Sequence, residues 1–181
     1  MVVRGLAGAV GLTGRNRRAR RSPTLKGMRA AVLTVSTTRA RGEGEDLSGP
    51  ALVELCRAAG LETSHEVVPD DHVAIAGALR RLADEQDVRF VFTAGGTGMT
   101  ADDVTPEATR EVIDREAPGF AETMRAESRR HTPLGILTRG VSGIRGRTLI
   151  VNFPGSPKAS GELWPVIEPT LRHTAATLER A

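Results

Sequence analysis

The chain has 181 residues, with 25 Lys or Arg and 22 Asp or Glu side chains and a formal net charge of +3. This length suits one compact domain, with or without a tail, and the single cysteine, Cys56, excludes an internal disulfide. The sequence has no apolar run near the roughly 20 residues of a membrane span. Its early apolar piece, residues 6–12, precedes the arginine cluster at 15–21, the reverse of the order in a secretory signal. We therefore expect a soluble cytoplasmic protein.

The positive charge is concentrated at the N-terminus. Residues 1–26 carry seven basic and no acidic side chains, which leaves 18 basic against 22 acidic residues in the rest. A nucleic-acid binder usually carries positive charge and stacking aromatics on its folded surface, yet the chain has four Phe, one Trp and no Tyr. We predict a basic, disordered tail over 1–27, one domain over 28–181, and neither nucleic acid nor membrane as a partner. Met28 is an alternative start of the protein.

The predicted elements alternate between strands and helices. Near-continuous apolar runs predict buried strands at 29–35, 88–94 and 147–153, and a weaker alternation predicts one at 61–68. Apolar side chains at helical spacing fill 50–59, where Cys56 should be buried, and 73–85. This order predicts an α/β fold with a parallel sheet and helices on both faces.

The second half continues the pattern. Thr105 as a capping hydroxyl, followed by Pro106 and Glu107, predicts a helix to about residue 115. A helix over 120–130 follows the break at 118–119, and glycines over 135–147 indicate a short strand or turn. The last helix should begin after Ser156.

The loop after the strand at 88–94 is rich in glycine. Its sequence, TAGGTGMTADDVTP, places Gly95, Gly96, Thr97 and Gly98 directly after a buried strand, with Asp103 just before a helix. Backbone amides in such a loop can converge on an anion without obstruction by Cβ atoms. The loop matches neither a Walker P-loop nor a GxGxxG fingerprint, so a tight turn is the alternative interpretation.

Two further loops carry polar candidates. Ser156, a following proline and Lys158 form a helix start that favours phosphate, although a simple turn with a solvated lysine is the alternative. Asp70 and Asp71 follow the weak strand, and we favour helix capping for Asp71.

Three loops should meet at one edge of the sheet: the loop at 95–103, the loop at 154–158 and the acidic loop at 70–71. Asp70 and Asp103, from different loops, suit a magnesium–nucleotide site. The four histidines show no metal-ligand spacing and are interpreted as structural; they are His65, His72, His131 and His173.

Three segments carry a family resemblance: TAGGTGMTADDVTPEAT, DREAPGFAETMR and LTRGVSGIRGRTLIVNFPGSPK. They resemble the molybdenum-cofactor biosynthesis proteins of the MogA/MoaB type, the molybdopterin adenylyltransferases, over about residues 29–178. The resemblance implies a three-layer αβα fold with a mostly parallel sheet and a homotrimer or hexamer. It also implies other molybdenum-cofactor pathway proteins as partners, and transfer of AMP from MgATP to the terminal phosphate of molybdopterin with release of pyrophosphate.

The resemblance also implies roles for residues. Asp103 and Asp70 match the catalytic acids, and we assign Mg²⁺ to both. The residues assigned to nucleotide or pterin binding are Gly95, Gly96, Thr97, Gly98, Thr105, Pro154, Gly155, Ser156 and Lys158. Asp46 and residues 48–50 resemble the D-x-SGP segment of the family. The attacking phosphate oxygen is already an anion, so no Ser–His–Asp triad is required. Arg139, Arg145, Arg147 and Lys158 are the available cations, and the sequence does not choose among them.

Two departures from the family pattern stand out. Residues 36–39 read STTR where many members have Ser-Asp, which puts one polar contact in doubt. Ala101 and Asp102 stand where relatives often have a basic residue, so nucleotide affinity is lower or the cation comes from elsewhere. The alternatives to an adenylyltransferase are a non-catalytic molybdopterin carrier or scaffold and a nucleotide-hydrolysing relative of the competence-damage type. Retention of both aspartates favours catalysis, and the lack of a fused second domain disfavours the hydrolase.

Overall fold

A six-stranded sheet forms the centre of the molecule, in the order β2-β1-β3-β6-β5-β4. The structure is a computed structural model that describes residues 24–180. Four neighbouring strands are parallel: β2 (Glu62–Val68), β1 (Arg29–Val35), β3 (Phe90–Ala94) and β6 (Thr148–Phe153). Beyond β6, two antiparallel strands extend the sheet, β5 (Ser142–Arg145) and β4 (Arg115–Glu116). The predicted, mostly parallel sheet is confirmed.

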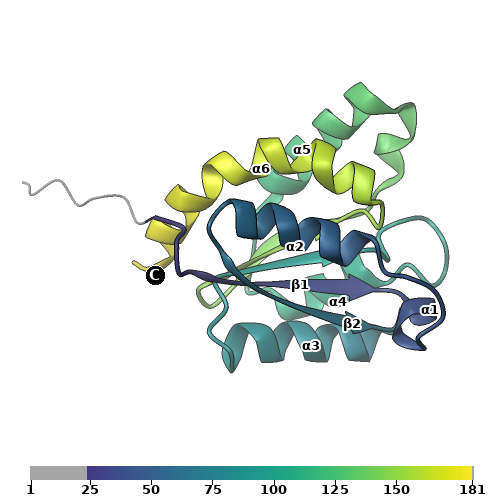
Figure 1. The fold of residues 1–181 in the computed structure, drawn as a ribbon, viewed down its shortest axis with the longest axis horizontal. Coiled ribbons are helices and arrows are strands. Elements are labelled where there is room, and N and C mark those ends of the chain that lie inside the picture. Colours follow the sequence, from purple (N-terminus) through teal and green to yellow (C-terminus); the bar gives the residue numbers. More distant parts are fainter. Residues whose placement is uncertain (1–23, 181) are drawn as a thin grey trace, which may run out of the picture.

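Helices cover both faces of this sheet (Figure 1). One face carries α2 (Ser48–Ala58), α5 (Pro118–His131) and α6 (Pro157–Leu178), and the other carries α3 (His72–Asp84) and α4 (Thr105–Val112). Two short helices, α1 (Thr37–Ala40) and the 3₁₀ helix η1 (Pro133–Leu137), complete the fold. Within residues 24–180, no helix combines the length and the apolar character that crossing a membrane requires. The layers are those of the predicted αβα fold.

Each face of the sheet packs a separate apolar cluster. Under α2 and α6, the ring of Phe92 meets those of Phe153 and Trp164 edge to face, with centroids 5.9 and 5.4 Å apart. On the α3 side, Ile75 belongs to a second buried cluster, which also contains residues of β1, β3 and β6. Cys56 is completely buried, as predicted, and burial raises the pKa of its thiol to about 12. It is therefore a core side chain rather than a reactive one.

Several helix ends differ from the prediction. Thr105 does not cap α4: Val104 occupies the cap position, and the Thr105 hydroxyl donates to the carbonyl of Gly95 at 3.0 Å. The same helix ends at Val112 instead of residue 115, because the following backbone is extended and pairs with β5. By contrast, the Asp71 carboxylate caps α3 as predicted, accepting from the Ala74 amide at 2.8 Å.

The predicted tail reaches into the core at its last residues. Residues 1–23 lie outside the described part of the chain, but Leu25 is only 5% exposed and packs in the cluster under α2 and α6. Its carbonyl also accepts from the Met28 amide at 3.0 Å. Leu25, which the sequence places in the predicted tail, therefore packs with the domain.

Removing residues 1–26 should lower the free energy of unfolding by about 2–3 kcal/mol, because a buried leucine is lost. Removing only residues 1–23 should leave that free energy unchanged. Urea unfolding of the two truncated proteins beside the full chain measures the difference. Equal stability of the two truncated proteins would contradict the role given to Leu25.

Candidate functional site

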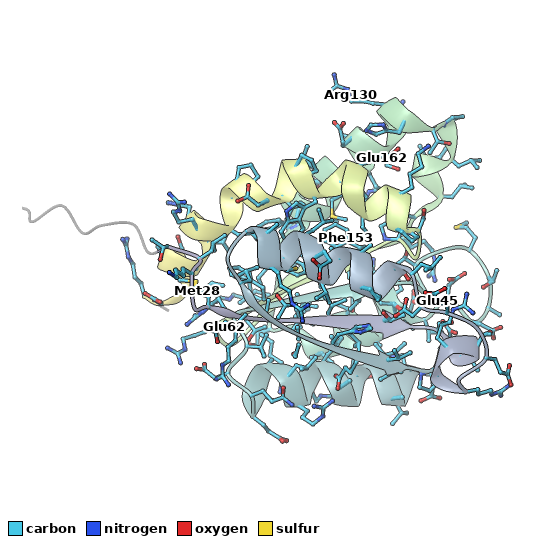
Figure 2. All side chains as sticks on the ribbon, in the orientation of Figure 1. Met28, Glu45, Glu62, Arg130, Phe153 and Glu162 are labelled. Atoms are coloured by element: carbon cyan, nitrogen blue, oxygen red, sulfur yellow. The ribbon has the colours of Figure 1, made fainter. Side chains whose placement is uncertain are left out.

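A cleft lies where the chain changes direction across the sheet. Strand β1 pairs with β2 on one side and with β3 on the other, so the connections leave in opposite directions and open a crevice at the carboxyl ends of β1 and β3. A cleft of about 340 Å³ lies there, and its floor includes Thr34, Val35 and Gly95. Glu45, another lining residue, lies at this end of the molecule, whereas Met28 and Glu62 lie at the opposite end (Figure 2). This cleft lies at the carboxyl ends of the parallel strands, the edge at which the sequence predicts that the loops meet.

Close backbone approach shapes this cleft. Gly95 has a φ of +111°, and a Cβ atom on it would lie 2.4 Å from the carbonyl oxygen of Val35. A Cβ on Gly155 would lie 3.2 Å from the Cα of Gly95, and the Gly95 amide donates to the Phe153 carbonyl at 3.2 Å. The glycine loop and the loop after β6, predicted to come together, are thus in contact.

Buried hydroxyl and amide groups fix the glycine loop to the sheet. The amide of Thr105 donates to the Gly96 carbonyl at 3.0 Å, and its hydroxyl donates to the Gly95 carbonyl. Asn152 donates from Nδ2 to the hydroxyls of Thr93 and Thr109, at 3.1 and 3.0 Å. Strands β3 and β6 and helix α4 are joined by these bonds, so the loop rests on a rigid base.

Asp103 lies beside the glycine loop in a second cleft, of about 540 Å³, together with Glu107 and Arg139. Its Oδ2 accepts from the amide and the hydroxyl of Thr100, at 2.8 and 2.6 Å. Burial alone would raise the pKa of Asp103, but the hydrogen bonds from Thr100 and from the Gly98 backbone, with the charge of Arg139, outweigh it and lower this pKa. Asp103 is therefore ionised at neutral pH.

Arg139 is the cation that the structure places at the glycine loop. Its Nε donates to the Gly98 carbonyl at 2.6 Å, its Nη2 donates to the Asp103 carbonyl, and its Nη1 pairs with Glu107 at 2.5 Å. Its amide also donates to the Thr97 carbonyl at 2.8 Å. A basic side chain from a distant loop thus lies beside the glycine loop, whose own residues Ala101 and Asp102 supply no cation.

The other predicted cations lie elsewhere or point to solvent. Arg145 pairs with Asp84 at 2.6 Å, and Arg147 pairs with Asp87, which precedes β3 at the amino end of the strands. Lys158 is 84% exposed and faces Glu162 at 3.6 Å. Of the four cations, Arg139 is the one that contacts the glycine loop in the structure.

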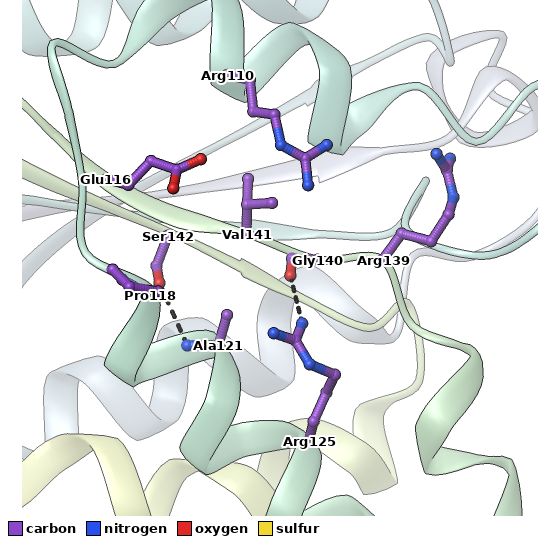
Figure 3. A pocket seen from close by; sticks show the side chains of 9 residues that line it. All are labelled: Arg110, Glu116, Pro118, Ala121, Arg125, Arg139, Gly140, Val141 and Ser142. Atoms are coloured by element: carbon purple, nitrogen blue, oxygen red, sulfur yellow. Dashed lines mark hydrogen bonds between the residues drawn. The ribbon is translucent and has the colours of Figure 1, made fainter.

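A third cavity, of about 450 Å³, lies behind Arg139 and is lined by residues of α4, α5 and β5 (Figure 3). Figure 3 shows the guanidinium of Arg110 directed into it. Arg125 donates to the carbonyl of Gly140 at 2.8 Å, and so holds the backbone next to Arg139. Arg139 thus lines both this cavity and the cleft of Asp103.

Asp70 is engaged at the start of α1. Its Oδ2 accepts from the Thr37 amide at 2.6 Å, and its own amide donates to the Thr37 hydroxyl at 3.0 Å. Thr37 belongs to the STTR segment that departs from the family pattern, so this segment keeps a polar contact of its own.

The two predicted acids lie on loops that follow β2 and β3, and β1 lies between these strands. Asp70 is not among the residues that line the cleft of Asp103, and neither acid lines the cleft between β1 and β3. In the described residues, no group of three or more His, Cys, Asp or Glu side chains is arranged to hold a metal ion. A magnesium ion shared by the two aspartates stays a prediction.

Part of the cleft consists of residues that the sequence did not predict as site residues. Thr34, Ser36 and Arg39 line it, and none was assigned to the site. The available signal was their place at the end of the first strand, where a switch in strand order opens a crevice. That switch depends on which strands pair, and the sequence pattern does not give the pairing.

Comparisons with known proteins agree on one family. A family model described as "Probable molybdopterin binding domain" matches residues 31–173. The molybdopterin adenylyltransferase of Helicobacter pylori J99 is 39% identical over 143 residues, which cover 77% of this chain and 81% of that protein. The molybdopterin adenylyltransferase of Escherichia coli K12 is 40% identical over 138 residues, covering 75% and 71%. The structure of the molybdopterin biosynthesis enzyme MoaB from Thermus thermophilus has a TM-score of 0.77 and 43% identity, covering 85% and 98%.

Proposed function

This chain belongs to the molybdopterin-binding domain family, and we propose that it transfers AMP from ATP to the terminal phosphate of molybdopterin. The observation that carries the proposal is the switch-point cleft, which adjoins a glycine loop held by Arg139 and an ionised Asp103. The chain also spans most of the length of two relatives that bear the name of this activity.

In this reaction, an oxygen of the molybdopterin phosphate forms a bond to the α-phosphorus of ATP. The bond from that phosphorus to the bridging oxygen of the β-phosphate breaks, and pyrophosphate leaves. The nucleophile carries negative charge at neutral pH, so no general base is needed. The protein must align two anions that repel each other and stabilise charge on the α-phosphate. Arg139 and the backbone of the glycine loop supply positive potential for this task.

The donor set at Asp103 fits a magnesium ion. An ionised carboxylate is a hard oxygen ligand, and Mg²⁺ in nucleotide sites usually takes one or two carboxylates together with substrate phosphates. Asp103 would hold the ion, with Asp70 as the second predicted acid. When bound, Mg²⁺ neutralises phosphate charge. Arg139 and the glycine loop would then orient both substrates.

The proposal divides the cleft between the two substrates. Gly95, Gly96, Thr97 and Gly98 would bind the nucleotide. Thr105, which the resemblance assigns to the same role, is fully buried and bonds the Gly95 and Gly96 carbonyls, so it would support this loop instead. Pro154, Gly155 and Ser156 would contact the pterin, with Lys158 near its phosphate. Assembly as a homotrimer or hexamer, a cytoplasmic location and contact with other molybdenum-cofactor pathway proteins belong to the same proposal. A non-catalytic molybdopterin carrier is the alternative.

The test is release of pyrophosphate from molybdopterin, ATP and Mg²⁺. We expect one pyrophosphate for each adenylylated molybdopterin, and no release when molybdopterin is omitted. Binding of both substrates without release would support the carrier instead. Release of phosphate products without molybdopterin would support the nucleotide-hydrolysing alternative.

A further inference from the structure

Thr34, Asp46 and His65 form a polar cluster beneath the first turn of α2. The Thr34 hydroxyl donates to Asp46 Oδ2 at 2.7 Å. Nε2 of His65 lies 3.0 Å from that hydroxyl and 3.2 Å from the same carboxylate oxygen. Thr34 is 1% exposed, and the side chains of Asp46 and His65 are 13% and 26% exposed. Three separate elements, β1, the loop before α2 and β2, supply the three groups.

The number of protons available in this cluster shows that His65 is a hydrogen-bond donor. Thr34 has one hydroxyl proton, which goes to Asp46, so its oxygen can only accept from His65. Nε2 must therefore carry a proton and be the donor. In a hydrolytic triad, by contrast, the hydroxyl and the carboxylate contact opposite nitrogens of the ring. Here both contact Nε2, so Thr34 is not an activated nucleophile and His65 is a fixed donor.

Asp46 connects this cluster to helix α2. Its second oxygen, Oδ1, accepts from the amide and hydroxyl of Ser48, at 3.0 and 3.1 Å, and from the Gly49 amide at 3.0 Å. Burial alone would raise the pKa of Asp46, but donation from Thr34, Gly49 and Ser48, with the charge of His65, outweighs it and lowers this pKa. One ionised carboxylate thus joins the sheet to the start of α2.

Gly49 makes the close approach possible. A Cβ atom at this position would lie 2.2 Å from His65 Nε2, 2.3 Å from Thr34 Oγ1 and 2.6 Å from Asp46 Oδ2. Any other residue would force α2 and these three side chains apart. The contact between the helix start and the cluster is therefore built into the backbone.

The loop held by Asp46 is a wall of the switch-point cleft, because Glu45, Leu47 and Ser48 line that cleft together with Thr34. We propose that His65 is a positioning residue: by donating from Nε2 to Asp46 and Thr34, it holds the 45–48 wall in place for a substrate. This inference rests on the proposed adenylyl transfer for its kinetic part only. Without the donor, Asp46 keeps its bonds to Thr34, Ser48 and Gly49, so the fold persists while the wall loosens.

The kinetic test compares His65→Leu, which removes the donor, with His65→Gln, whose amide can donate from the same place. For His65→Leu we expect the KM of ATP or of molybdopterin to rise about tenfold, with kcat within about twofold, as for loss of one hydrogen bond to a charged group. His65→Gln should restore most of that KM. His72→Leu is the control, because His72 pairs with Glu111 on the other face of the sheet and should leave both constants unchanged. Unchanged KM values in His65→Leu, or a glutamine variant as impaired as the leucine variant, would overturn the proposal.

A second measurement is independent of activity. Hydrogen exchange at the amides of Ser48 and Gly49 should be about tenfold faster in His65→Leu than in the wild-type protein or in His72→Leu, because these amides donate to the carboxylate that His65 orients. Unchanged exchange would overturn the positioning role. If the wild-type protein released no pyrophosphate and the exchange rates still differed, the proposed function would fail and the positioning role would stand.

Discussion

Asp103→Asn is expected to lower pyrophosphate release by about a hundredfold or more, the scale of loss when one electrostatic group is removed from a reacting centre. Asparagine keeps the shape of the side chain and an oxygen that can accept from the Thr100 amide. The substitution therefore removes charge and leaves the loop geometry. Without that charge the proposed magnesium ion is lost, and the triphosphate faces a second phosphate unshielded. The measurement is pyrophosphate release under saturating ATP, molybdopterin and Mg²⁺, with binding of molybdopterin followed separately and expected to persist.

Asp102→Asn is the matched control for this experiment. Asp102 is the preceding residue and carries the same charge, but its side chain is exposed and is not among those lining the cleft of Asp103. Its substitution should leave the rate unchanged. An Asp103→Asn protein that works at the wild-type rate would remove Asp103 from the proposed site.

Gly95→Ala is expected to lower the free energy of unfolding by about 3 kcal/mol and to abolish substrate binding at the cleft. The added Cβ would lie 2.4 Å from the Val35 carbonyl oxygen, a backbone atom that cannot turn aside. The residue would also have to adopt a φ of +111°, which is unfavourable for alanine. Both costs are of the size known for strained backbone and overpacked sites. Urea unfolding and pyrophosphate release measure the two effects.

Gly161→Ala is expected to have the opposite effect on stability from Gly95→Ala. Gly161 lies within α6, and an added Cβ there meets no atom within 4 Å. Alanine in an open helical position should stabilise the protein by about 0.5–1 kcal/mol and leave activity unchanged. If Gly95→Ala were as stable as Gly161→Ala, the close approach of β1 to the glycine loop would not govern the cleft.

The parallel strands are predictable because each carries its own signal. A buried strand such as β3 is apolar except for Thr93, so the near-continuous apolar run at 88–94 is recognisable without knowledge of its neighbours. Strand β4 has only two residues, Arg115 and Glu116, and exists because β5 offers it a partner. Thr105 shows the same limit: its local pattern fits a helix cap, but its hydroxyl bonds a carbonyl ten residues away. Whether residues 115–116 form a strand, and whether Thr105 caps a helix, depends on partners that are distant in the sequence.

In the candidate site, too, features with a local sequence signal are predictable and features that depend on long-range contacts are not. Glycines next to a buried strand indicate a backbone site from local sequence alone, and the loop at 95–98 is found in this way. Arg139 could not be separated from Arg145 and Arg147, because all three are cations on one glycine-rich stretch and differ only in what they contact. The cluster of Thr34, Asp46 and His65 depends on the pairing of β1 with β2, which no local pattern contains.

The position of β6 has a consequence for synthesis of the chain. β6 lies between β3 and β5, in the interior of the sheet, yet among the strands of residues 24–180 it is the last to leave the ribosome. A nascent chain that ends before residue 148 therefore leaves one edge of β3 unpaired and apolar, the kind of edge on which chains aggregate. The contact of Gly155 with Gly95 forms later still. The ability to hold substrate thus arises only after residue 155 has been made.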